Sequence, residues 1–198
     1  MKKIALLSMA LCLTGCMTVN EGLLRRTEIP ENSKNDILIE LKSGELVQKH
    51  NGQGINQGVL SGTTVINNVG KSFLSLWKSK GVISDYGVAG DLEKSPDYTL
   101  MLSGVKNEDS NLTVAVLSGL AFGLIPVSAT LTYDLDVDLV NNRTQQHFKT
   151  KVKNAVTTWT QILLLPALPF SFIGSYNMLS DMSAYTYDEL YKQGAFNK

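Results

Sequence analysis

Cys16 follows a stretch that has the anatomy of a secretory signal. The chain begins Met1-Lys2-Lys3, continues as an apolar run from Ile4 to Leu13, and then reaches Thr14-Gly15-Cys16. A basic start, an apolar core of about ten residues and small residues before a cut are the parts of such a signal, and the core is too short to span a bilayer permanently. We therefore expect residues 1–15 to be removed on export. The alternative is an ordinary secretory signal followed by a chance cysteine.

The segment Leu13-Thr14-Gly15-Cys16 resembles the lipobox of bacterial lipoproteins. The resemblance implies that the Cys16 thiol is acylated, with palmitate or related chains, and that this lipid holds the mature chain on a membrane. Each buried methylene adds about 0.8 kcal/mol, so several chains form a permanent anchor. Met17 stands where an Asp would resemble an inner-membrane retention signal, so the resemblance implies the outer membrane. We expect the periplasmic face, and exposure at the cell surface stays open.

The remaining thiols and charges argue against several classes of function. Once residues 1–15 are removed and Cys16 carries lipid, Cys12 is gone too, and no thiol is left for a disulfide or a thiolate metal site. Loss of Lys2 and Lys3 reduces the eighteen basic residues to sixteen, against eighteen acidic ones. Such a domain lacks the basic face that nucleic-acid binding requires, so we expect no nucleic-acid partner.

The triplet Gly70-Lys71-Ser72 could belong to a phosphate-binding loop. That pattern needs a glycine five residues before Gly70, where Val65 stands, and the triplet lies inside a helical pattern rather than before one. We interpret Lys71 as a solvated helix residue.

Three aspartates alternate along one expected strand, and three lysines alternate along the next. A strand spaces such aspartates about 6.8 Å apart, too far for one calcium ion. Pairing of the opposite charges across a hairpin explains both sets better. The residues are Asp134, Asp136 and Asp138, and Lys149, Lys151 and Lys153.

No catalytic motif is visible in the sequence. His50 lies in an expected loop and His147 on the lysine face, and the patterns HExxH, GxSxG and CxxC are absent. We predict that the protein is not an enzyme and holds neither cofactor nor metal. The alternative is a small-ligand carrier, or an enzyme whose groups converge from distant positions.

Hydrophobic periodicity predicts an α+β fold, an antiparallel sheet with one or two packed helices. Val65, Val69, Phe73, Leu76 and Trp77 share one face of the clearest helix. The expected elements are a strand at Ile37–Leu41, a glycine-rich loop of about fifteen residues after Gly44, a helix from Val65 to Gly81, a short strand at Val82–Tyr86, a strand at Tyr98–Ser103, strands at Leu131–Leu139 and His147–Lys153, and a helix at Met178–Lys192.

The two strands with the charged residues form the best hairpin signal. Asn141-Asn142 suits a two-residue turn, because Asn tolerates positive φ. Such a turn places Asp134 opposite Lys149 and Asp136 opposite His147. A slide of the register by two residues keeps the charges on one shared face.

Two long segments, 110–133 and 154–180, contain no charged residue. The apolar part of the first, fourteen residues between Asn111 and Pro126, is too short for a spanning helix, and the second is interrupted by Pro166 and Pro169. They are either buried core, or membrane-associated, or a surface for a partner, in which Gly119 and Gly123 would allow close helix approach. For membrane or partner contact, the candidate residues are Leu117, Leu120, Phe122, Trp159, Leu164 and Phe170.

The order of these motifs resembles a group of uncharacterised Gram-negative envelope lipoproteins. The likeness includes Asp97-Tyr98-Thr99-Leu100, Leu124-Ile125-Pro126, Thr157-Thr158-Trp159 and the run from Leu165 to Phe170. We expect a signal peptide at 1–15, a lipid-anchored tether at 16–34 and one α+β domain at 35–198. The expected function is a non-catalytic, lipid-anchored envelope protein that contacts a membrane or another envelope protein. The oligomeric state is left open.

Overall fold

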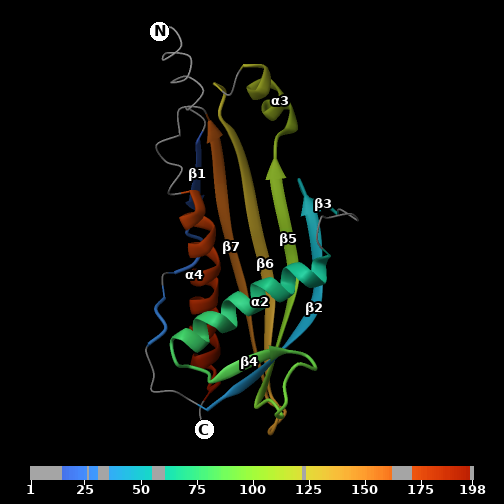
Figure 1. Cartoon of the computed structure of the whole chain (residues 1–198), viewed down its shortest axis with the longest axis vertical. Helices are drawn as coiled ribbons and strands as arrows, with labels where there is room; N and C mark the ends of the chain where they lie inside the picture. Colours follow the sequence, from blue (N-terminus) through green and yellow to red (C-terminus); the bar gives the residue numbers. More distant parts are fainter. Residues whose placement is uncertain are drawn as a thin grey trace, which may run out of the picture.

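The body of the protein is a long twisted sheet with two helices across one face (Figure 1). The computed structural model describes residues 15–25, 27–30, 36–54, 61–121, 124–161 and 171–196. The sheet has the order β1-β7-β6-β5-β2-β3, and β4 pairs with β2. Its strands are β1 (Gly15–Asn20), β2 (Leu38–His50), β3 (Gln53–Gly54), β4 (Asp85–Val88), β5 (Tyr98–Ser110), β6 (Val127–Asn141) and β7 (His147–Gln161).

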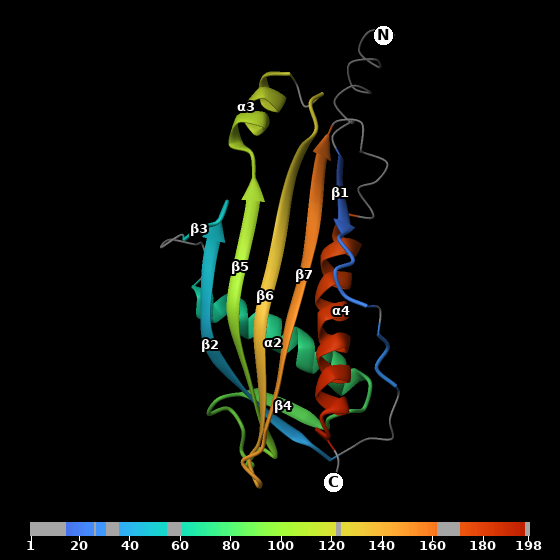
Figure 2. The same ribbon diagram turned by 180° about the vertical axis from the view of Figure 1, so that it is seen from behind.

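Most neighbouring strands are antiparallel, whereas β2 runs parallel to both β4 and β5. The helices are α2 (Gly62–Ser79), α3 (Leu112–Leu120) and α4 (Ser171–Lys192). Helices α2 and α4 cover one face, and no helix of the described residues covers the other, which faces the viewer in Figure 2. The predicted α+β class is confirmed.

The core lies between the sheet and the two covering helices. Alternation along β6 turns Leu135, Val137 and Leu139 inward, where each is almost completely buried. Trp77 of α2 is fully buried, packs edge-on against two aromatic rings, and donates its indole N–H to the Ser183 carbonyl of α4 at 3.2 Å. The predicted helix from Val65 is therefore confirmed, with its apolar face toward the sheet.

The hairpin between β6 and β7 has the predicted strands, but the two-residue turn is wrong. Val140 pairs with His147, and the Asn141 side chain accepts hydrogen bonds from the backbone N–H groups of Arg143 and Thr144 inside the loop. The register therefore shifts by four residues from the predicted one. This shift is even, so the charged residues still share one face. The observed pairs are Asp134 with Lys153, Asp136 with Lys151 and Asp138 with Lys149.

Several predicted elements extend further than expected. The first strand continues through Gly44 to His50, with a register shift between Ser43 and Leu46, so the glycine-rich loop is shorter than predicted. The C-terminal helix begins at Ser171 rather than near Met178.

The segment 16–34 was expected to be a tether, and part of it belongs to the sheet. Its first residues lie in β1, which pairs with β7, and Ile29 is buried in the core. The run Met17-Thr18-Val19 provides β-prone side chains, and a neighbouring strand edge provides the partner.

Among the helices of the described residues, none is both long enough and apolar enough to cross a membrane.

Candidate functional site

Helix α3 forms a tip at one end of the sheet, in the connection between β5 and β6 (Figures 1 and 2). Asn111 caps its start, because the side-chain oxygen accepts from the Val114 N–H at 3.2 Å. Below the helix, the Asn51 amide exchanges two hydrogen bonds with the backbone of Ser110. The last residue of β5 is thus held to the turn after β2, so the tip starts from a fixed base.

The polarity of α3 is the reverse of that of an ordinary surface helix. Its buried residue is Ser118, whose hydroxyl donates to the Ile125 carbonyl at 2.6 Å. Leu112 and Leu120 are 76% and 74% exposed, and Val116 and Leu117 also face solvent. A helix that only completes a core turns its apolar side chains inward. This arrangement instead presents an apolar surface to the outside.

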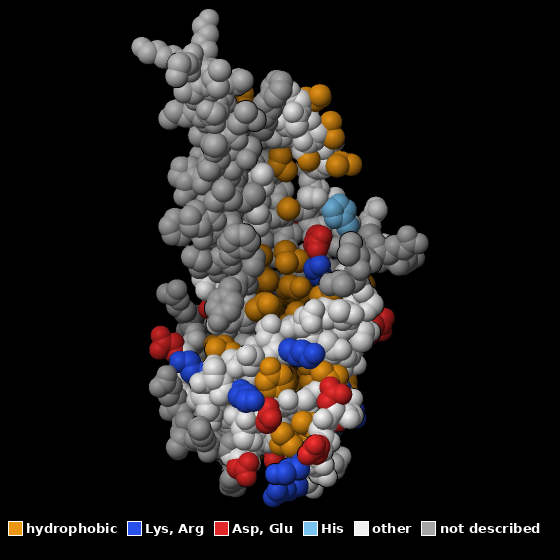
Figure 3. Space-filling model, in the orientation of Figure 1, with side chains coloured by type: hydrophobic (Ala, Val, Ile, Leu, Met, Phe, Trp, Pro, Cys, Tyr) orange, Lys and Arg blue, Asp and Glu red, His pale blue; other side chains and the backbone are white. Residues whose placement is uncertain are grey.

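The apolar surface continues beyond the helix. Leu124 and Ile125 are exposed in the chain that returns to β6. Figure 3 shows hydrophobic side chains over α3, with the charged side chains of that view below it. The sequence from Ser110 to Tyr133 contains no charged residue. We call the exposed side chains of this region the apolar tip, which consists of Leu112, Val116, Leu117, Leu120, Leu124 and Ile125.

The register of the sheet brings Cys16 to the same end. Cys16 pairs with Thr160 of β7, and Thr160 pairs with Val127 of β6. These three residues form one row across the sheet, and Val127 is the residue where β6 begins after the tip. The backbone of the predicted lipidation site therefore lies at the same end of the sheet as the base of the apolar tip, two strands away, although the two are far apart in sequence.

Trp159 lies one row further into the sheet. It pairs with Met17 on one side and Ser128 on the other, and its side chain is 40% exposed. Odd-numbered positions of β7 from Lys149 to Trp159 share a face with Lys151 and Lys153, the face that α2 and α4 leave bare.

Three of the six predicted contact residues are therefore exposed at one end of the molecule: Leu117, Leu120 and Trp159. Phe122, Leu164 and Phe170 lie outside the described residues. Leu112, Val116 and Leu124 belong to the same surface; they lie in the charge-free segment predicted for contact but were not among its named candidate residues. The four-residue spacing of Leu112, Val116 and Leu120 places them on one side of a helix, but the same spacing is found on buried and on exposed helices.

The lysines of β7 pair with the aspartates of β6, as the sequence predicts. Lys151 Nζ lies 3.0 Å from Asp136, and the neighbouring pairs measure 3.4 Å (Lys149 to Asp138) and 3.9 Å (Lys153 to Asp134). The hydrogen bond that Lys151 donates to the Asp136 carboxylate raises the pKa of Lys151 above its ordinary value. Exposed pairs of this kind add little stability and mainly favour one register.

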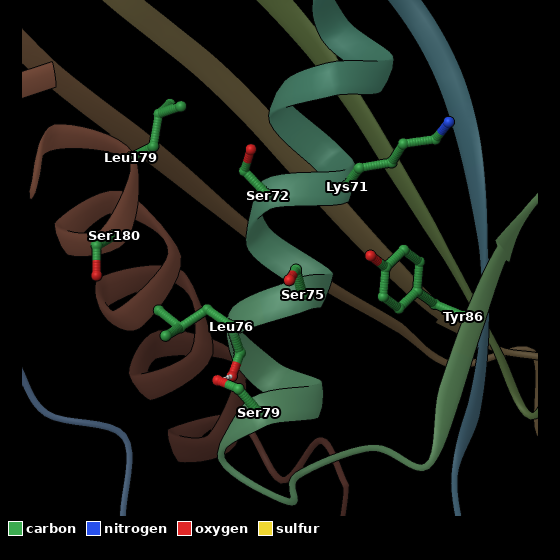
Figure 4. Close-up of a pocket in the computed structure, with 8 residues that line it drawn as sticks. All are labelled: Lys71, Ser72, Ser75, Leu76, Ser79, Tyr86, Leu179 and Ser180. Carbon is green, nitrogen blue, oxygen red and sulfur yellow. Dashed lines mark hydrogen bonds between the residues drawn. The ribbon is translucent and has the colours of Figure 1, made fainter. Parts of the chain in front are cut away.

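A shallow groove between α2 and α4 is lined largely by polar side chains (Figure 4). Two of its serines are engaged with their own helix: the Ser72 hydroxyl donates to the Asn68 carbonyl and the Ser79 hydroxyl to the Leu76 carbonyl. Lys71 is exposed at its rim, as predicted for a solvated helix residue. Within the described part of the chain, no three His, Cys, Asp or Glu side chains are placed to hold a metal ion.

No family model matches the sequence, and neither does any curated protein. Among solved structures, the chain is similar to protein XCC0632 from Xanthomonas campestris, with 11% identity over 86% of this chain and 95% of that one, at a TM-score of 0.41. It is also similar to a neuraminyllactose-binding hemagglutinin homolog from Helicobacter pylori (8% identity, 86% and 98% covered, TM-score 0.38). A PelC dodecamer from Paraburkholderia phytofirmans shares 12% identity over 89% and 96%, at a TM-score of 0.32.

Proposed function

We propose that this protein is a non-catalytic envelope lipoprotein, anchored to the outer membrane by lipid on Cys16, that contacts the membrane or another envelope protein through its apolar tip. The observation that carries the proposal is the shared position of two independent features. The lipobox-like segment leads into β1, and the apolar tip lies at the end of the sheet where β1 begins.

The exposure of the tip supports contact rather than a role in the core. A single exposed leucine is ordinary on any protein, whereas a contiguous apolar patch without charge is typical of an interaction site. Leu112 and Leu120 are each about three-quarters exposed, and no charged side chain lies between Ser110 and Tyr133.

The test of the anchor is the fate of the N-terminus. We expect mass spectrometry of the mature protein to find acyl chains on Cys16 and fractionation to find the protein in the outer membrane. In a matched control, an ordinary cleavable signal precedes Met17, so that export continues without acylation. An unmodified Cys16 in the native protein would contradict the lipoprotein assignment.

The test of the tip is a charged substitution. Leu120→Asp should leave the purified domain folded, because Leu120 is 74% exposed, and should weaken association of the unacylated domain with membranes. Unfolding of the domain by this substitution would show that the tip is part of the core and would contradict the contact function.

A small-ligand carrier is the second candidate, and the groove between α2 and α4 favours it. Ser75 and Ser180 line this groove together with the Tyr86 ring (Figure 4). Native mass spectrometry of the purified protein tests the idea, since a carried ligand adds a fixed mass. Ser75→Leu should then abolish that mass without changing membrane localisation.

A further inference from the structure

We propose that the apolar tip inserts into the interfacial layer of the same membrane that holds the lipid on Cys16, so that the long strands stand upright on the bilayer. The inference rests on the proposed function, because the lipid anchor provides the first attachment. The inference goes beyond the proposed function because it names lipid as what the tip contacts and gives the orientation of the whole sheet on the membrane.

The first argument is that transfer of the tip from water into lipid requires little free energy. Its leucines and valines already face outward, so insertion requires no refolding. Its polar groups are largely paired: Asn111 caps the helix start, Ser118 donates to Ile125, and the backbone N–H groups of Ala121 and Leu124 bond carbonyls within the tip. Each unpaired backbone group costs several kcal/mol in hydrocarbon, and these bonds satisfy such groups in the described part of the tip.

The second argument is the position of the first charges. Asp109 pairs with Thr130 of β6, three residues further into the sheet than Val127. Three strand residues cover roughly 10 Å, so carboxylates begin about 10 Å below the base of the tip. An interfacial helix enters the bilayer by about 5–10 Å. The tip can therefore enter to this depth before any carboxylate of β5 reaches the hydrocarbon.

The third argument favours lipid over a protein partner. Cys16 and Val127 occupy one row of the sheet, so acyl chains on Cys16 place the base of the tip directly at the bilayer surface. Trp159 lies in the adjacent row, and tryptophan concentrates at the membrane–water boundary. Because the anchor confines the chain to the surface, a small apolar patch suffices for a second attachment.

The consequence is a defined orientation. Strand β6 runs fifteen residues from Val127 at the tip to Asn141 at the opposite end. At about 3.3 Å per residue, the β6–β7 loop stands roughly 45–50 Å from the membrane. The Asp97–Arg143 ion pair at 3.1 Å marks that distal end.

The chain contains a built-in reporter for the test. It has two tryptophans, of which Trp77 is fully buried and Trp159 is 40% exposed. We would reconstitute the acylated protein into phosphatidylcholine vesicles whose acyl chains carry bromine at defined depths, and measure quenching of tryptophan fluorescence. We expect quenching by shallow bromines, its loss in Trp159→Phe, and protection of Trp159 from aqueous acrylamide.

Substitutions then separate the tip from the anchor. For the unacylated domain that begins at Met17, Leu120→Asp should lower partition into these vesicles by about tenfold or more, because it removes the transfer of one large apolar side chain. The matched control is Val47→Asp, which places the same charge at a 40% exposed apolar position in the body of the sheet and should leave partition unchanged.

The outcomes distinguish this inference from the proposed function. An acylated protein whose Trp159 is quenched by acrylamide but not by brominated lipid overturns the insertion and leaves the anchor intact. Absence of acyl chains on Cys16 overturns the anchor, whatever the tip does. Shielding of Trp159 in native membranes but not in pure lipid vesicles also overturns insertion and assigns the tip to a protein partner.

Discussion

At the scale of single residues, two buried hydroxyls on α4 differ in what they contact. Ser183 donates its hydroxyl to the Phe73 carbonyl of α2 at 3.1 Å, whereas the Thr186 hydroxyl finds no partner among the described residues. Both side chains are fully buried. A buried polar group without a partner costs free energy, while a paired one contributes about 1 kcal/mol.

Thr186→Val should therefore stabilise the fold by about 1 kcal/mol, because it replaces the unpaired hydroxyl with a methyl of similar size. Ser183→Ala is the matched comparison and should destabilise by a similar amount, since it removes the hydrogen bond between the two helices that the Ser183 hydroxyl donates to the Phe73 carbonyl. Urea unfolding of both variants measures the two changes. A destabilised Thr186→Val protein would mean that the hydroxyl has a partner that the described residues do not include.

Because its phenol is buried, Tyr133 should cause a loss of stability at alkaline pH. Burial raises the pKa of its phenol to about 12, and the nearby Glu108 carboxylate acts in the same direction. An unfolded chain releases this proton near pH 10. The folded state holds the proton more tightly than the unfolded state. The stability that the protonated Tyr133 contributes is therefore fully present below pH 10 and is lost as the pH rises to about 12.

Over that range the free energy of unfolding should fall by about 2–3 kcal/mol on account of Tyr133 alone. Tyr133→Phe removes the titrating group, so its stability should decline less steeply between pH 10 and 12 than that of the native chain. Tyr191→Phe controls for the loss of one exposed phenol. Identical alkaline profiles for Tyr133→Phe and the native chain would show that the Tyr133 pKa is not raised.

At the scale of elements, the centre of the sheet depends on Gly104. Its φ of +143° lies in a region that suits glycine, and a Cβ there would stand 2.2 Å from the Asp134 carbonyl oxygen of β6. Opposite it, β2 has its register shift between Ser43 and Leu46. The two irregularities lie side by side, so the sheet bends where β2, β5 and β6 meet.

Gly104→Ala should destabilise the protein by at least about 3 kcal/mol, because the clash is with the backbone of β6 and not with a side chain that could move aside. Gly54→Ala is the control, since a Cβ there meets nothing within 4 Å. Thermal unfolding followed by circular dichroism compares the two. Equal melting temperatures would show that β5 can shift against β6 at this point.

The sequence could predict those features of an element that depend on its local pattern. It could not predict features that depend on contacts between distant residues. Alternation in β6 and β7 correctly predicted which side chains face the core, because side-chain parity is a local property. The loop of that hairpin could not be predicted from Asn141-Asn142 alone, since longer loops suit the same residues. Pairing of β1 with β7 joins residues about 140 positions apart, which periodicity cannot show.

The same distinction applies to the candidate site. The charge-free run around α3 was evident from sequence, and so was the position of Cys16 behind a signal-like stretch. Their proximity follows only from the order β1-β7-β6, which is set by tertiary pairing. The outward orientation of the leucines was equally hidden, because a short apolar helix has the same sequence pattern whether it is buried or exposed.

At the scale of the whole molecule, the tip and the sheet contribute unequally to the free energy of folding. The large buried side chains, Trp77 and Phe73 among them, lie between the sheet and the covering helices. Helix α3 packs against β6, yet of its nine residues only Ser118 is buried. Burial of apolar surface is the main source of folding free energy, so the tip should contribute little to it.

Replacement of Asn111–Pro126 with a short glycine-containing loop tests this division. Ser110 pairs with Ala129, so the ends to be joined already lie side by side. The Asn51 hydrogen bonds to Ser110 also remain in place. We expect the free energy of unfolding to change by less than about 1 kcal/mol, equivalent to roughly 2–4 °C in melting temperature. The shortened domain, made without the lipid, should have lost its affinity for vesicles.

The matched comparison is Trp77→Ala. This substitution should lower the free energy of unfolding by about 3–5 kcal/mol, because it leaves a cavity in the core and removes the hydrogen bond to Ser183. If tip removal were as costly as this core substitution, the leucines of α3 would be needed for folding and their exposure would not indicate a binding role. A stable, tipless protein that still bound vesicles would instead assign membrane contact to another surface. Stability retained and binding lost would show that this end of the sheet is maintained for contact rather than for folding.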